Sequence, residues 1–480
     1  MTDPLSVLKR ATQFHHTARR SCSLSLVEDN TKPHTDDIYD FIGIGIGPFN
    51  LGLACLAQPI GELRCLFLEQ KSEFNWHPGM MLENARLQTP FMADLVTMAD
   101  PTSPFSFLNY AKQNGRLYQF CIRENFFLLR QEYNLYCRWV IEQLSCLKFD
   151  TEVVQVDYLT EASCYRIQIR HTKSGRSGFY FSKRLILGTG TQPSVPSCCT
   201  KLKSDFVHSA NYLHNKTKLF KKESIALVGS GQSAAEIFYD LLQNIDQHNY
   251  ELHWFTRSAQ FAPMDYTKLS LEMTSPDYLD YFYHLPQQQR HQLIKQQAHL
   301  YKGINSDLIN DIYDLLYVKH LTYSGITVKL HANTCLSDAH LNLTNQQFTL
   351  DFFHQQQNQH FSKNCDALIL ATGYEYQLPR FLNGIKNRIV WEDSGSKNNN
   401  AIPKASYNYA IDQSGCEIFA QNLGLNTHGF VTPDLSMAAY RNASIINAIL
   451  GHPYYSIEKN IAFQCFSAPE DMFSLTLARA

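Results

Sequence analysis

The sequence lacks paired or regularly spaced cysteines. It has 13 cysteines, which is an odd number, and none of them form a CxxC pair. Metal centres and disulfide frameworks need regular spacing, so neither is expected here. We expect free and mostly buried thiols, as in a protein of a reducing compartment.

The sequence also lacks long apolar runs and an excess of one charge. No run approaches the ~18 apolar residues of a membrane span. The net charge is -2, with acidic and basic residues interspersed, so neither a nucleic-acid surface nor a membrane anchor is predicted. Residues 1–38 are polar and have no apolar core of a secretory signal. We interpret them as a flexible N-terminal extension and expect a cytoplasmic protein.

Two segments of the chain share one local pattern. The 480 residues, 44% of them hydrophobic, suffice for two or three domains. "YDFIGIGIGPFN" (39–50) and "SIALVGSGQSAAE" (224–236) are apolar runs that end in a glycine turn and continue into a helical pattern. A second apolar run follows each helix, "RCLFLEQ" and "ELHWFTRS". Strand, glycine turn, helix and strand form the βαβ unit, so the sequence predicts an α/β fold with two Rossmann-like dinucleotide-binding domains.

The first unit has the glycine spacing of a pyrophosphate site. Backbone N–H groups at a helix N-terminus neutralise phosphate charge, and glycines let the phosphate approach. Gly45, Gly47 and Asn50 give G-x-G-x-x-N, and Gly43 lies just upstream. Glu69 ends the second strand, where an acid accepts hydrogen bonds from ribose hydroxyls.

The second unit differs at the equivalent of the acid. Gly229, Gly231 and Ala234 give G-x-G-x-x-A, but Arg257 follows the second strand. A cation there suits a 2′-phosphate, which favours NADPH over NADH. The two units together predict a flavoprotein with FAD in the first unit and NADPH in the second. A disulfide reductase would share both units but needs a redox cysteine pair.

Longer motifs resemble the flavin-dependent N-hydroxylating monooxygenases of siderophore biosynthesis, from about Tyr39 to Gly451. The matching segments are "GIGIGPFNL", "WHPGMMLENARLQTPF", "DPTSPFSFLNYAKQNGRLYQF", "VGSGQSAAE", "DALILATGYEYQLP" and "NTHGFVTPDLSMAAYRNASIIN". The resemblance implies a split FAD domain, an inserted NADPH domain and a small helical substrate region. It also implies a chemistry, in which NADPH-reduced FAD forms a C4a-hydroperoxide with O2 and hydroxylates a primary amine.

The resemblance assigns domain boundaries and further site residues. The FAD domain is expected over 39–203 and 366–455, the NADPH domain over 204–264 and 321–365, the helical region over 265–320, and a tail over 456–480. A homo-oligomer, dimer or tetramer, is expected. Additional cofactor contacts are expected at Pro48, Trp76, His77, Gln88, Gln232, Ser233, Ala371, Thr372, Gly373, Tyr374, Asp434 and Leu435.

Two departures from the family pattern concern the substrate. In the amino-acid hydroxylases the segment like "FMADLV" has a lysine that contacts the substrate carboxylate, and here that position is Ala93. The asparagine of an F-x-N-E segment is replaced by Leu271. A carboxylate left unpaired at this end would cost several kcal/mol. The departures therefore favour an amine without a carboxylate, with putrescine or cadaverine first.

Several alternatives stay open at this level. Another residue could bind a carboxylate, in which case lysine or ornithine is the substrate, and histamine is a further option. Remoter alternatives are a different flavin- and NADPH-binding oxidoreductase and a non-catalytic nucleotide-binding module. Glu272, Asp265 and Tyr266 are candidates for the far ammonium of a diamine, and Asn305 for a contact near the amine or nicotinamide. No catalytic base and no metal ligand can be assigned.

Overall fold

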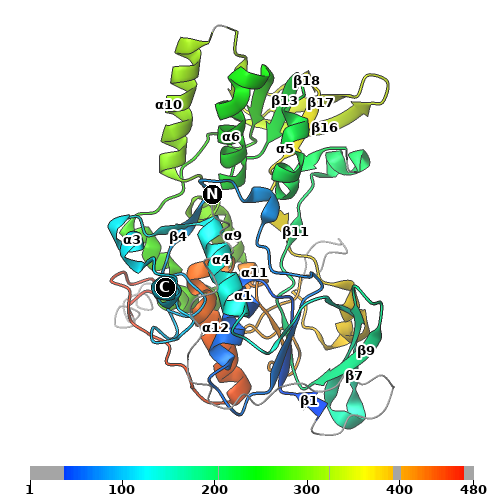
Figure 1. The fold of residues 1–480 in the computed structure, drawn as a ribbon, viewed down its shortest axis with the longest axis vertical. Helices are drawn as coiled ribbons and strands as arrows, with labels where there is room; N and C mark the ends of the chain where they lie inside the picture. The colour runs from blue at the N-terminus through cyan, green and yellow to red at the C-terminus, as the bar shows by residue number, and fades with distance from the viewer. Residues whose placement is uncertain (1–36, 204, 324, 393–401, 470–480) are drawn as a thin grey trace, which may run out of the picture.

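The computed structural model describes residues 37–203, 205–323, 325–392 and 402–469. Two units, each built on a parallel sheet, follow one another along the long axis of the molecule (Figure 1). The expected extension over 1–38 lies outside the described residues apart from its last two. No helix in the described ranges is both long and apolar enough to cross a membrane.

The first unit contains a five-stranded sheet in the order β21-β10-β2-β3-β6, with every pair parallel. Its strands are β21 (Ile418–Ala420), β10 (Leu185–Leu187), β2 (Phe41–Ile44), β3 (Cys65–Leu68) and β6 (Leu147–Lys148). The central strands are buried on both faces, which explains their uninterrupted apolar sequences. Helix α1 (Pro48–Ala57) packs against two others, α12 (Ala438–Leu450) and α4 (Arg130–Ile141).

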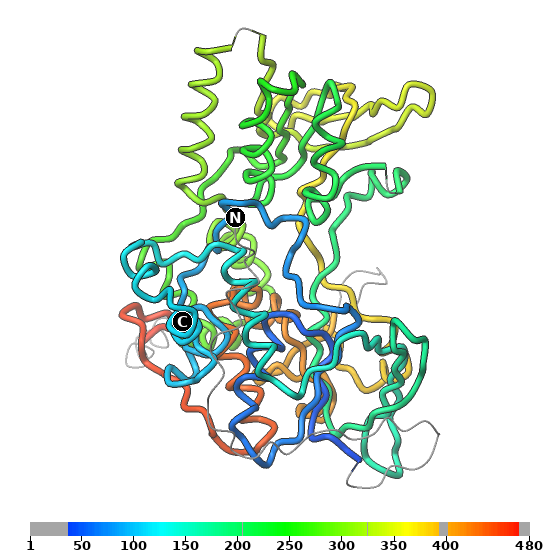
Figure 2. The backbone as a smooth tube through the Cα atoms, in the orientation of Figure 1, coloured from blue at the N-terminus to red at the C-terminus, as the bar shows by residue number. Residues whose placement is uncertain are grey.

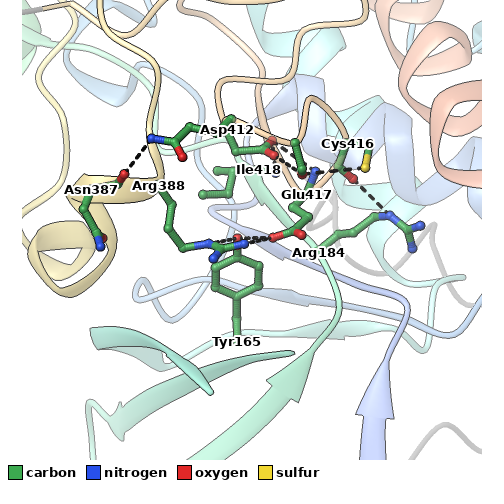
Figure 3. A network of polar contacts seen from close by, with 10 residues as sticks. Tyr165, Arg184, Asn387, Arg388, Asp412, Cys416, Glu417 and Ile418 are labelled. Carbon is green, nitrogen blue, oxygen red and sulfur yellow. Dashed lines mark hydrogen bonds and ion pairs between the residues drawn. The ribbon is translucent and has the colours of Figure 1, made fainter. Parts of the chain in front are cut away.

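A four-stranded sheet extends the first unit. Its order is β1-β9-β8-β7, with β1 (Ile38–Tyr39), β9 (Ser177–Ser182), β8 (Cys164–His171) and β7 (Thr151–Leu159). The segment η9 (Arg380–Arg388) packs on β7. Figure 3 shows how the end of η9 is joined to β8 and to the residue before β21: Arg388 pairs with Glu417 at 2.6 Å, and the Tyr165 hydroxyl donates to the same carboxylate at 2.6 Å. Segments far apart in the sequence are thereby tied together.

The second unit contains another five-stranded parallel sheet, in the order β12-β19-β13-β14-β15. Its strands are β12 (Val207–His208), β19 (Ala367–Leu370), β13 (Ser224–Val228), β14 (Glu251–Phe255) and β15 (Val328–His331). Three antiparallel strands cover one side, β16 (Thr334–Asn342), β17 (Gln347–His354) and β18 (Gln359–Cys365). Phe255 and Phe352 stack across the contact, with centroids 4.1 Å apart. The helices are α5 (Tyr212–Leu219), α6 (Gln232–His248) and α10 (Ser306–Thr322).

Two domain boundaries differ from the predicted ones. Strand β19, expected in the FAD domain, pairs with β13 and β12 and so belongs to the second sheet. Helix α10, expected in the helical substrate region, packs along α6 and places Ile312 in the core of the second unit. In both cases a long-range partner decides the unit to which the element belongs.

The helical region lies against the first unit. It consists of α7 (Lys268–Leu271), η7 (Glu272–Thr274), α8 (Pro276–His284), α9 (Gln287–Gln296) and η8 (Gln297–Leu300). Tyr278, Leu279 and Phe282 of α8 join the apolar core around α1 and α12. The described part of the C-terminal tail runs beside these helices. We call residues 456–466 of this tail the C-terminal strap.

The chain passes between the two halves several times (Figure 2). Two of these passages form a short antiparallel ribbon, β11 (Gln192–Pro193) with β20 (Tyr374–Glu375). Two others are also hydrogen-bonded to each other, because Met264 N–H donates to Ile304 and Ile304 N–H donates to Ala262. The connections between the halves are therefore paired rather than single strands.

Candidate cofactor and substrate site

The first glycine turn is shaped to hold a phosphate. Gly45 has φ +92°, and a Cβ there would lie 2.4 Å from the carbonyl oxygen of Gly188. Gly47 is the N-cap residue of α1, no side chain caps the helix, and a Cβ on Gly47 would meet no atom within 4 Å. The α1 N-terminus thus faces open space with free N–H groups, which fits a pyrophosphate.

Neighbouring side chains fix this turn. Asn50 is buried and donates from Nδ2 to the Gly45 carbonyl oxygen at 2.8 Å. Pro48 occupies the first turn of α1, where its missing N–H costs nothing. Glu69 directly follows β3, and one of its carboxylate oxygens accepts from Ile46 N–H at 2.9 Å. Gly43 lets the Phe67 ring pack on the strand. The expected residues of the first unit therefore lie together at one sheet edge.

The second turn repeats this design. Gly229 has φ +153°, and a Cβ would lie 2.3 Å from the Ala371 carbonyl oxygen. Gly231 is the N-cap residue of α6, again without a side-chain cap, and Gln232, Ser233 and the buried Ala234 form the first turn of that helix. This helix N-terminus also fits a pyrophosphate.

Arg257 has a second cation near it, which the sequence motif did not indicate. Arg257 is exposed just after β14. Burial and the charge of Arg257 both lower the pKa of Lys302. Two cations at this edge of the second unit suit a phosphate monoester. The sequence analysis had predicted a 2′-phosphate contact for Arg257 alone.

Residues expected at different cofactors contact each other between the units. Gln88 Nε2 lies 3.4 Å from Gln232 Oε1, and the same oxygen accepts from Asn305 N–H at 2.9 Å. Thr372 Oγ1 donates to the Ser194 carbonyl oxygen at 2.5 Å, next to Gly373 with φ +81°.

Aromatic side chains surround the same region. The His77 ring centroid lies 5.0 Å from that of Trp76 and 5.9 Å from that of Tyr374. His77 itself adopts a left-handed backbone conformation with φ +48°. Asp434 Oδ1 accepts a hydrogen bond from Ser436 N–H, and burial raises the pKa of Asp434. Leu435 follows Asp434 at the start of η11 (Leu435–Met437).

His428 is a packing residue. It is 1% exposed, stacks on Tyr409 with centroids 4.2 Å apart, and bonds to the Tyr407 carbonyl oxygen. Burial lowers its pKa to about 3. A neutral, fully enclosed imidazole does not reach a substrate.

An ion pair joins the units beside these residues. Arg130 of α4 contacts both carboxylate oxygens of Glu236 of α6 at 2.7 Å and donates to the Met80 carbonyl oxygen. Glu236 is 6% exposed. Burial raises the pKa of Glu236, and Arg130 opposes that shift. The residues lie 106 positions apart, and no local sequence signal announces the pair.

Replacing Arg130 with alanine is expected to destabilise the protein by about 3–5 kcal/mol, because Glu236 would remain buried without its partner. Chemical unfolding measures this. The matched control is Arg170→Ala, which breaks a surface pair with Glu152 and is expected to cost at most ~1 kcal/mol. Equal losses in the two variants would contradict a special role of the buried pair.

A cavity of about 210 Å³ lies at the expected substrate end. Ala93, which is 4% exposed, lines it together with Pro90, two residues after Gln88, and Ser436, directly after Leu435. We call it the Ala93 cavity. Among its described lining residues there is no lysine, arginine or histidine. The cavity thus borders segments with expected flavin contacts and offers no cation to a carboxylate.

The other expected substrate contacts are not among the lining residues of this cavity, and each has other contacts in the structure. Both carboxylate oxygens of Glu272 accept hydrogen bonds from the C-terminal strap, so this acid holds the chain rather than an ammonium. Asn305 caps α10 by accepting from Asp307 and Leu308 N–H. Leu271 ends α7 outside the cavity lining.

Asp265 and Tyr266 are also engaged by their own surroundings. Asp265 accepts from Thr267 N–H and from the Ser270 hydroxyl. The Tyr266 ring packs edge-on against Phe127. Ala93 is therefore the expected substrate residue that the structure places in the cavity wall.

Two parallel sheets, each with an open glycine turn, define an oxidoreductase of the two-dinucleotide class. The family model of L-lysine 6-monooxygenase/L-ornithine 5-monooxygenase matches residues 37–376, and the chain belongs to this family. It is an N-hydroxylating monooxygenase of the siderophore-biosynthesis type, as its motifs predicted.

Several relatives are named for diamines. The chain is 53% identical to putrescine N-hydroxylase of Shewanella oneidensis, over 90% of this chain and 84% of the relative. It is 47% identical to putrescine N-hydroxylase of Acinetobacter baumannii, over 90% and 95%. The FAD-bound cadaverine monooxygenase of desferrioxamine biosynthesis from Erwinia amylovora superposes with TM-score 0.87 at 51% identity, covering 91% of this chain and all of that one.

Proposed function

We propose that this enzyme uses FAD, NADPH and O2 to hydroxylate one amino nitrogen of an aliphatic diamine, putrescine or cadaverine, for a hydroxamate siderophore. The balance is R-NH2 + O2 + NADPH + H⁺ giving R-NHOH + NADP⁺ + H2O. The observation that carries the proposal is the Ala93 cavity, which borders segments with expected flavin contacts and whose described lining residues include no cation for a carboxylate. The diamine names of close relatives support the same substrate class.

The bound cofactors supply the redox chemistry: NADPH-reduced FAD activates O2 for transfer of one oxygen atom. The protein holds the two cofactors through the α1 and α6 N-termini, with Glu69 for a ribose and Arg257 for the 2′-phosphate. Gln88, Gln232 and Asn305 link the two sites.

The cavity favours the neutral form of the amine that reacts. The attacking nitrogen must be neutral, whereas a free alkylamine has pKa near ~10.4. Apolar walls formed by residues such as Ala93, Met98 and Ala443 disfavour the ammonium form inside the cavity.

A substrate panel tests the proposal. Putrescine, cadaverine, histamine, lysine and ornithine are compared by hydroxylamine formed per NADPH consumed, which separates hydroxylation from release of peroxide. The diamines are expected to give the highest ratio. A higher ratio with lysine or ornithine would assign the amino-acid activity instead, and NADPH oxidation without hydroxylamine from any amine would overturn the proposal.

Replacing Ala93 with lysine is expected to lower kcat/KM for diamines at least ~10-fold, because an ammonium in the cavity wall repels a cationic substrate. Ala93→Met is the matched control, since it adds similar bulk without charge. Steady-state kinetics with putrescine and ornithine measure the effect, and Ala93→Lys is expected to favour ornithine relative to Ala93→Met. Indistinguishable diamine kinetics for the two variants would contradict a charge-selecting role.

We further propose that the enzyme works in the cytosol as a homo-oligomer, a dimer or tetramer. Support comes from an apolar outer face on α10, where Tyr313, Tyr317 and Leu321 are more than half exposed. Light scattering of the purified protein measures the number of subunits.

A further inference from the structure

The C-terminal strap is fastened to the helical region by two carboxylates. Asp277 accepts from the backbone N–H groups of Asn460, Ile461 and Ala462, at 2.7–2.9 Å. Glu272 accepts from the next two, Phe463 and Gln464. Five consecutive N–H groups thus donate hydrogen bonds to two carboxylates, and these bonds fix the path of the strap.

An aromatic contact reinforces this docking. The Phe466 ring lies edge-on to Tyr278, with centroids 5.0 Å apart, and also packs on Tyr281. Phe466 thereby joins the apolar core of the first unit. The strap is part of the folded enzyme and not a loose end.

The fastened strap closes one side of the Ala93 cavity. Ser456, Ile457, Glu458 and Ile461 line the cavity from the strap. Glu458 is the charged residue among the described lining residues, and the structure gives its carboxylate no hydrogen bond or ion pair. Glu458 is exposed to solvent at this wall. An acid without a partner at the wall of an apolar cavity is available to a ligand cation.

The lining of the cavity therefore combines an apolar surface with one carboxylate. One side borders segments with expected flavin contacts through Pro90 and Ser436, and the strap brings a carboxylate to another side. The same lining includes Ala93, Met98 and Ala443, whose apolar surface suits a methylene chain. A linear diamine offers the matching groups, namely a methylene chain and a charged nitrogen in addition to the nitrogen that reacts.

We propose that Glu458 is a specificity-determining residue that binds the unreacted ammonium of the diamine, and that Asp277 and Glu272 position it through the strap. The inference rests on the proposed function and deepens it. The carboxylate keeps the distal nitrogen charged, since an opposite charge favours the ionised form, while the reacting nitrogen loses its proton against the apolar lining. A monoamine of equal length lacks the group that Glu458 recognises.

The test compares diamines with monoamines in wild-type and Glu458→Gln holoenzyme. Calorimetric Kd values are measured for putrescine and cadaverine and for butylamine and pentylamine, beside kcat/KM. The variant is expected to weaken diamine binding about tenfold and to leave monoamine binding within about twofold. Diamine binding by the wild type is also expected to weaken more steeply with salt than binding by the variant, because this contact is open to solvent.

Further variants separate the charge and the position of Glu458 from general effects on the fold. Glu458→Asp keeps the charge and is expected to recover part of the diamine affinity. Asp277→Asn loosens the strap and is expected to reduce diamine preference in the same direction. Glu142→Gln, which removes an exposed acid outside the cavity, is the control and is expected to bind as the wild type does.

The outcomes distinguish this inference from the proposed function. If the wild type hydroxylates diamines but Glu458→Gln binds them as tightly, or loses diamines and monoamines equally, the role of Glu458 is overturned. If the wild type hydroxylates no amine, the proposed function itself fails.

Discussion

Replacing Gly45 with alanine is expected to reduce the flavin content of the purified protein at least ~10-fold. A left-handed backbone costs a non-glycine residue roughly 1–2 kcal/mol. The larger effect is steric, because the new Cβ would lie 2.4 Å from the Gly188 carbonyl oxygen. Either β10 moves away from β2 or the turn changes shape, and both displace the N–H groups of α1. Flavin absorbance per polypeptide is the measurement.

Gly61→Ala is the matched control for this variant. Gly61 has no left-handed φ, and a Cβ there would meet nothing within 4 Å. It is expected to retain wild-type flavin content. Full flavin content in Gly45→Ala would show that the phosphate does not depend on this turn.

Replacing Arg257 with alanine is expected to raise KM for NADPH ~10- to 100-fold while changing KM for NADH little. We expect the guanidinium to contact the 2′-phosphate, which NADH lacks, so the lost interaction is specific to one coenzyme. Lys302→Ala is expected to act in the same direction with a smaller effect, since its ammonium lies near Arg257. Steady-state kinetics with both coenzymes measure the difference.

Arg176→Ala controls for the change in net charge. Arg176 is exposed between β8 and β9 in the first unit, away from the second dinucleotide turn. It is expected to leave both KM values unchanged. Equal increases for NADPH and NADH in Arg257→Ala would mean that the coenzyme preference lies elsewhere.

The glycine turns could be predicted from sequence because their geometry is local. Gly45 and Gly229 each lie at the end of a buried strand and one turn before a helix, so spacing alone fixes their place. Ala93 could be compared with the lysine of the amino-acid hydroxylases for a similar reason, because it lies in a short motif that aligns without gaps.

The errors concern contacts between distant segments. Glu272 was expected to face the substrate, but its partners Phe463 and Gln464 lie some 190 residues further along the chain. Strand β19 was recognised as a strand, yet its sheet is decided by pairing with β13, which begins at Ser224. Glu458 lies in a tail without any motif. Such choices depend on packing and hydrogen bonding across the fold, which local patterns do not encode.

The paired passages between the units have a mechanical consequence. A body attached at two points can turn freely only about the line that joins them, and each attachment here is a hydrogen-bonded pair of chains, β11 with β20 and the segment around Met264 with Ile304. The buried ion pair between Arg130 and Glu236 joins the units at a further place, so a swing of either unit against the other is restricted. We therefore expect the two dinucleotide turns to keep one relative position while the enzyme works.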